Sequence, residues 1–136
     1  MNNPKISDAE IAQELKSFER TEVNDSTISD VIENEEYVKK ISKKGPLQAK
    51  IDDIKLLFEM LRNNGKENSK GEKFSISPMA IAIVLGALLY IVSPIDIIPD
   101  AIPVIGFIDD AAIITAAIAQ IRKIGNDIDN FKKWKE

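Results

Sequence analysis

Hydrophobic residues in the first half of the chain recur every three or four positions, which is the spacing of one face of an α-helix. Three such stripes predict helices over about residues 8–21, 27–44 and 47–63. The apolar positions are Ile11, Leu15 and Phe18, then Ile28, Val31, Ile32, Val38 and Ile41, then Leu47, Ile51, Ile54, Phe58 and Leu61. No strand-like alternation competes with this pattern, so the front half is predicted to be helical.

Polar residues mark where these helices begin and end. Ser7 and Glu10 have the spacing of a capping box, and a second cap is expected at Ser26 or Thr27. Gly45-Pro46 ends the second helix, and the Asn-Asn-Gly sequence that finishes at residue 65 ends the third. The residues that follow are polar, and residues 64–75 are predicted to form a mobile linker.

The stripes allow two interpretations. The helices can pack on one another, or one apolar face can dock on a membrane surface or a partner helix. The opposite face of the second helix is expected to be exposed and to carry two ion pairs of favourable spacing, Glu35 with Lys39 and Glu36 with Lys40.

The second half opens with an apolar run. Ser77 and Pro78 have the pattern of an N-cap and a first-turn proline, and residues 79–92 contain nothing more polar than Gly86 and Tyr90. About 20 mostly apolar residues suffice for a helix to cross a bilayer. Roughly ten large aliphatic side chains at about −0.3 to −0.6 kcal/mol each favour insertion, so this segment is predicted to span a membrane unaided.

A second apolar segment, residues 101–121, carries Asp109 and Asp110 near its middle. Two charged aspartates at a bilayer centre cost about 5 to 7 kcal/mol, more than the apolar side chains return. The segment is therefore expected to enter lipid only against the first one, with its aspartates protonated, paired or at an interface. Prolines 94, 99 and 103 and Gly106 separate the two segments, which predicts a helical hairpin with an irregular connection and a second helix capped by Asp109.

Charge divides the chain in the same way. Between Lys73 and Arg122 there is no lysine or arginine. We expect an all-α protein with a charged amphipathic helical region (1–63), a polar linker (64–75), an apolar helical hairpin (76–121) and a basic-leaning helical tail (122–136). Basic residues on both flanks of the apolar block predict that both ends of the hairpin face the cytoplasm.

Composition removes many functions. The 136 residues carry a net charge of −4 and include no histidine and no cysteine. Serine–histidine and cysteine–histidine relays, cysteine-ligated zinc and disulfides are therefore excluded. No catalytic constellation is recognisable, so we expect no enzyme. The acidic balance also argues against a nucleic-acid partner.

The connection carries a dense motif. The stretch from Tyr90 to Asp110, with Ser-Pro-Ile-Asp, Ile-Pro-Asp, Ile-Pro-Val-Ile-Gly and a final aspartate pair, closely resembles the signature of the YkvA-like family, a bacterial and archaeal domain of unknown function. The resemblance covers residues 76–121 and implies a short helical, membrane-associated domain without an assigned reaction. The motif positions are Tyr90, Ser93, Pro94, Asp96, Pro99, Asp100, Pro103, Gly106, Asp109 and Asp110.

Four aspartates in this motif have two interpretations. They can cap helices and form turns in the connection. Alternatively they converge into an all-oxygen site for a hard cation such as Mg²⁺ or Ca²⁺. The candidate ligands are Asp96, Asp100, Asp109 and Asp110.

Three functions remain open. The first is a non-enzymatic cell-membrane protein serving as an anchor, adaptor or small assembly factor, with membrane lipid as a partner and a protein partner bound through its N-terminal helices. The second is a soluble all-α bundle acting as an interaction module, with the apolar helix at its centre. The third is hard-cation binding or transport through the aspartates. Trp134 is expected either at a lipid interface or against the front helices.

Overall fold

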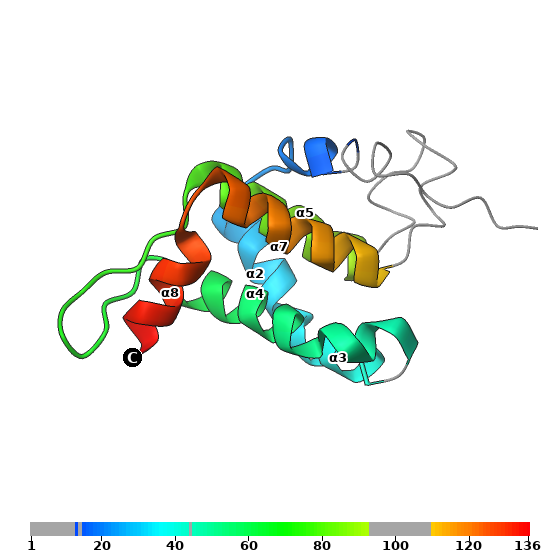
Figure 1. The fold of residues 1–136 in the computed structure, drawn as a ribbon, viewed down its shortest axis with the longest axis horizontal. Helices are drawn as coiled ribbons and strands as arrows, with labels where there is room; N and C mark the ends of the chain where they lie inside the picture. Colours follow the sequence, from blue (N-terminus) through cyan, green and yellow to red (C-terminus); the bar gives the residue numbers. More distant parts are fainter. Residues whose placement is uncertain (1–12, 14, 44, 93–109) are drawn as a thin grey trace, which may run out of the picture.

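The structure, a computed structural model, describes residues 13, 15–43, 45–92 and 110–136. Within these ranges the chain forms helices and one isolated β-bridge, which confirms the all-α prediction. A short helical turn at residues 15–18 comes first. The labelled elements are α2 (Asp25–Glu33), α3 (Glu35–Ile41), the 3-10 helix η1 (Gly45–Lys50), α4 (Ile51–Asn63), α5 (Pro78–Val92), α7 (Asp110–Ile124) and α8 (Asp127–Lys135) (Figure 1).

The predicted second helix is two helices, α2 and α3, separated at Asn34. The Asn34 side chain donates a hydrogen bond to the Asp30 carbonyl at 2.7 Å. Asparagine bonds readily to nearby backbone groups in this way, and it thereby interrupts the regular helical ladder. The start of α2 also differs from the prediction, because the cap is Asn24, whose Oδ1 accepts from the Thr27 backbone N–H at 2.8 Å.

The predicted third helix begins as η1 and continues as α4. Its end at Asn63 agrees with the sequence, and Gly65 then takes a φ of +83° that favours glycine. The tighter first turn has a role in packing, since η1 contacts α7 and places Leu47 in the core.

Helix α5 lies at the centre of the bundle. It contacts α2, α3, α4 and α7, and α7 runs alongside it in Figure 1. Of the residues from Ala80 to Ile91, all are buried except Leu89, which is partly buried. A helix with no polar face must be covered on all sides, and α7 and the apolar stripes of the front helices together supply that cover.

The prediction that α5 spans a membrane is not supported by the structure. Among the described residues, no helix combines the length and apolar character that crossing a membrane requires. Because the connection between α5 and α7 lies outside the described residues, the proline-broken hairpin stays a prediction.

The segment from Asn64 to Phe74 is an ordered turn, whereas the sequence predicted a mobile linker. Backbone hydrogen bonds join Gly65 N to the Phe74 carbonyl at 2.6 Å and Phe74 N to the Lys66 carbonyl at 2.9 Å. Phe74 is 3% exposed, and this anchor explains the difference, because a linker with a buried aromatic side chain is tied to the core. The turn and α8 lie together at one end of the molecule (Figure 1).

Candidate functional site

Most of the predicted motif lies outside the described residues. This applies to Ser93, Pro94, Asp96, Pro99, Asp100, Pro103, Gly106 and Asp109. Asp110 is the first residue of α7, in line with a helix predicted to begin at the aspartate pair, but its side chain is not described. Within the described ranges, no group of three or more acidic side chains is placed to hold a metal ion. The aspartate cation site therefore stays a prediction.

Tyr90 is the motif residue whose surroundings are described. It is 1% exposed near the end of α5, and its ring meets the edge of Phe18 at a centroid distance of 6.2 Å. Phe18 also covers Gly86, one turn earlier, so closely that a Cβ at Gly86 would lie 2.6 Å from the Phe18 Cβ and Cγ atoms. The small residue in α5 therefore serves contact with the N-terminal helical turn inside the same chain.

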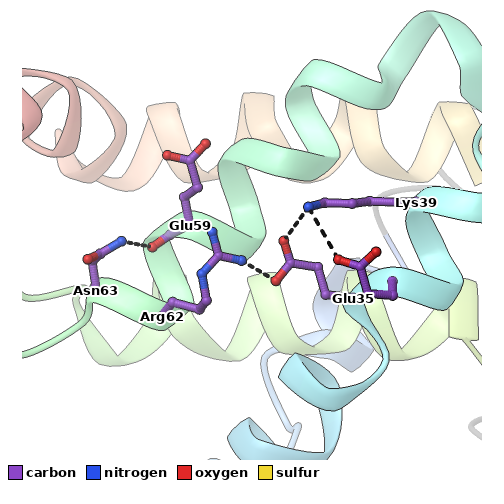
Figure 2. A network of polar contacts seen from close by, with 6 residues as sticks. Glu35, Lys39, Glu59, Arg62 and Asn63 are labelled. Atoms are coloured by element: carbon purple, nitrogen blue, oxygen red, sulfur yellow. Dashed lines mark hydrogen bonds and ion pairs between the residues drawn. The ribbon is translucent and has the colours of Figure 1, made fainter.

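A charged cluster joins α3 to α4 (Figure 2). The Glu35 carboxylate is bound by the Arg62 guanidinium from α4 and by Lys39 Nζ at 3.0 Å from its own helix. Glu36 is exposed and its carboxylate lies 3.8 Å from Lys39. The predicted Glu35–Lys39 pair is thus present, while Glu36 approaches Lys39 in place of its predicted partner Lys40.

Glu35 is buried, with only 8% of its surface exposed, although it was predicted on an exposed face. Burial raises the pKa of its carboxyl, but hydrogen bonds from Arg62 and Lys39 and their positive charges outweigh burial and hold the pKa below its ordinary value of 4.5. The sequence contained the signal, because Val31, Glu35 and Val38 share the four-and-three spacing of the buried face. We interpret this cluster as a latch between two helices.

The two basic flanks of the apolar block meet at the end of the molecule formed by α8 and the 64–75 turn. The indole Nε1 of Trp134 donates to the Glu72 carbonyl at 2.6 Å, and Asn68 Nδ2 donates to the Trp134 carbonyl at 3.0 Å. The Trp134 ring also lies 5.8 Å from each of Phe74 and Phe131. Trp134 therefore fastens α8 to the turn, a role that the sequence did not predict.

A second contact ties α8 to the start of α5. Asp127 Oδ2 accepts from the Ser77 backbone N–H at 3.0 Å and from its hydroxyl at 2.8 Å. This places a carboxylate at the positive end of the α5 dipole, which is favourable. Ser77 precedes Pro78 at the helix start, as predicted, but its hydroxyl serves this contact.

Next to Trp134 the surface is hollowed. A hollow of about 370 Å³ is lined by side chains and backbone of the turn and α8, namely Glu72, Lys73, Phe74, Ser75, Asn130, Lys133 and Trp134. Lys73 and Lys133 are exposed, and within the described part of the chain neither forms an ion pair. The lining thus combines the ammonium groups of Lys73 and Lys133 with two aromatic residues, Phe74 and Trp134, and the carboxylate-bearing Glu72.

Comparisons with known proteins bear on the apolar half of the chain. Residues 80–116 match the model of a family described as "Protein of unknown function (DUF1232)". This range includes most of α5, the motif and the first half of α7. The comparison with solved structures found no match.

A relative from Bacillus subtilis (strain 168), named "Uncharacterized membrane protein YkvA", is 37% identical over 87 residues. The alignment covers 62% of this chain and 74% of the relative. It therefore extends well beyond the motif. The chain belongs to the YkvA-like family, whose function is unknown.

Proposed function

We propose that this chain is a non-enzymatic protein of the cell membrane that acts as an anchor, adaptor or small assembly factor. The observation that carries the proposal is the charge-free helix α5, in a chain whose relative is named a membrane protein. Helix α7 lies against α5 and would accompany it into lipid, and the front helices α2, α3 and α4 that cover α5 would have to move away from it there. The absence of histidine and cysteine from the sequence supports a binding role over catalysis.

Cell fractionation tests this function. We expect the full chain to pellet with membranes and to stay there after an alkaline carbonate wash, because α5, once uncovered, would present lipid with an uninterrupted apolar surface. A peripheral protein held by charge alone would be released by the wash and would reduce the proposal to surface attachment. Recovery in the soluble fraction without detergent would overturn the proposal altogether.

The proposal includes an orientation with both basic flanks on the cytoplasmic side. Its support is the contact between the 64–75 turn and α8, since two flanks that meet cannot lie on opposite sides of a bilayer. The chain has no cysteine, so Ser69→Cys and Glu136→Cys each introduce a unique label site. Neither should react with an impermeant maleimide in intact cells, and both should react after lysis. Labelling of either one in intact cells would contradict this orientation.

The second candidate is a soluble helical bundle that acts as an interaction module. Its specific support is the enclosure of α5 by α2, α3, α4 and α7. A protein partner would meet the N-terminal helices at their outer face, where Tyr37 of α3 is 51% exposed. A monodisperse chain with a well-dispersed amide spectrum in detergent-free buffer would favour this candidate. Aggregation without detergent would count against it.

A further inference from the structure

We propose that the end of the molecule formed by the 64–75 turn and α8 is a docking surface for anionic phospholipid headgroups, with the hollow beside Trp134 at its centre. Such docking rests on the proposed function, membrane association, and specifies which surface of the chain meets the bilayer. Its basis is the distribution of charge, the lining of the hollow and the way in which the two segments are held together.

Positive charge is concentrated at this end of the molecule. The turn and the chain from Arg122 onward carry eight lysines and arginines against five acidic residues, while the rest of the chain carries ten against seventeen. The basic residues are Lys66, Lys70, Lys73, Arg122, Lys123, Lys132, Lys133 and Lys135, and all are exposed. Clusters of this size attract anionic lipid, so a chain of net charge −4 has one positive face that a negatively charged bilayer would select.

Several of these charges are available to a ligand. Lys135 is engaged by Glu59, whose carboxylate lies 2.6 Å from its Nζ. For the other seven, the described part of the chain provides no ion-pair partner. One acidic residue at this end, Asp127, already accepts two hydrogen bonds from Ser77. The other acidic residues at this end are Glu67, Glu72, Asp129 and Glu136, and Glu72 lines the hollow. Eight basic against five acidic residues leave an excess of three positive charges for an external anion.

The hollow adds a place for the headgroup itself. Lys73 comes from the turn and Lys133 from α8, so a phosphate between them would contact both segments. Asn130 and Ser75 supply neutral donors on the same lining. The Trp134 ring supplies an apolar surface, while its N–H is held by the Glu72 carbonyl, and tryptophan is enriched where headgroups meet acyl chains. This combination suits a phospholipid surface better than it suits a fully hydrated anion.

Rigid placement of the two lysines supports a preformed surface. The turn and α8 are joined by the Trp134 and Asn68 hydrogen bonds and by the aromatic contact between Phe74 and Phe131, with ring centroids 4.8 Å apart. Because these contacts join the two segments that carry Lys73 and Lys133, the charges are presented together without prior folding of the segment. Reversal of Lys73 and Lys133 should therefore act on one common site.

The test uses the full chain and sedimentation with vesicles, comparing phosphatidylcholine alone with equal parts of phosphatidylcholine and phosphatidylglycerol. The variant K73E/K133E is compared with K43E/K55E, which makes the same charge change at exposed lysines between α3 and η1 and on α4. We expect binding only to the anionic vesicles, weaker binding at high salt, and a loss of affinity of roughly 25-fold or more for K73E/K133E. The control variant should lose much less, and thermal melts should show that both variants remain folded.

Two results would overturn the docking surface. Equal losses in both variants would mean that binding follows net charge alone, and equal binding to both vesicle types would mean that the headgroup charge is not recognised. Either result leaves the proposed membrane function standing if the wild-type chain still pellets with cell membranes. That function fails separately, on recovery of the wild-type chain in the soluble fraction.

Discussion

At Gly86, the absence of a side chain allows α5 to pack closely against Phe18 of the N-terminal helical turn. The Gly86 Cα faces the Phe18 side chain with no room for a Cβ. Gly86→Ala should lower the free energy of unfolding by up to about 2 kcal/mol, because overpacking costs about 1–3 kcal/mol and alanine regains roughly 1 kcal/mol in helix propensity. Urea denaturation followed by circular dichroism measures the change.

Gly125 provides the matched control. An added Cβ there would meet no heavy atom within 4 Å, so Gly125→Ala should change stability by less than about 0.5 kcal/mol. A Gly86→Ala variant more stable than wild type would contradict the close approach of Phe18 to α5.

Glu35 makes stability depend on pH. Its pKa is lowered in the folded chain, so its stabilising contribution is complete well above the ordinary value of 4.5 and is lost as pH falls through the folded value. Glu35→Gln should therefore reduce stability at pH 7 by about 1–2 kcal/mol, the lower part of the range for charged hydrogen bonds because Arg62 and Lys39 are partly exposed. The difference from wild type should shrink in acid.

Glu36→Gln is the control for this position, since the Glu36 side chain is 90% exposed and only 3.8 Å from the same lysine. The free energy of unfolding, measured from pH 7 down to pH 3, should depend on pH in nearly the same way for Glu36→Gln and wild type. Equal pH profiles for the Glu35 and Glu36 variants would show that the α3–α4 latch has no special energetic role.

At the scale of single helices, the sequence and the structure assign different N-cap residues to α2, and substitutions can distinguish the two assignments. The sequence favoured Ser26 or Thr27, whereas the structure uses Asn24. Asn24→Ala should cost about 1 kcal/mol, because it leaves the Thr27 amide without its acceptor, and Ser26→Ala should cost less than about 0.5 kcal/mol. Thermal melts of the two variants decide between them, and a larger loss for Ser26→Ala would restore the sequence-based assignment.

Helix existence was predictable here, and helix breaks were not. The three-and-four spacing of apolar residues located the helical regions that contain α2, α3 and α4, and Pro78 and the aspartate pair located the starts of α5 and α7. The helix predicted over residues 8–21 is described only as a short turn at residues 15–18, and its predicted start at Ser7 and Glu10 lies outside the described residues. The break at Asn34 depends on one side-chain hydrogen bond, and the 3-10 turn at Leu47 depends on contact with α7. The first is a local polar contact that hydrophobic periodicity does not register, and the second joins segments far apart in the sequence, so periodicity alone could not reveal them.

For the whole molecule, the decisive question is what surrounds α5. Its composition suits lipid and a protein core equally well, because both are apolar. The insertion energies calculated from sequence omit the competing contacts that Phe18, Ile54 and Val38 supply from elsewhere in the chain. The same limit applies to the basic end, since only the folded chain brings Lys73 and Lys133 to the lining of one hollow.

A charge inside α5 tests its enclosure. Leu88 is fully buried, so Leu88→Asp should destabilise the chain in detergent-free buffer by about 3–5 kcal/mol or prevent folding. Met79→Glu places the same charge on the same helix at a position that is 48% exposed and near the helix N-terminus, and it should be tolerated. Circular dichroism melts measure both, and equal effects would argue against a bundle closed around α5.

The attachment of Trp134 has a practical consequence for spectroscopy of this chain. Trp134 is the single tryptophan, and its indole stacks on Phe131 at an interplanar angle of 20°. Its emission therefore reports on the detachment of α8 from the turn. An emission change during denaturation that precedes the loss of helical signal would mark local release of the C-terminal helix, and unfolding of the α2–α5 core would have to be followed by another probe.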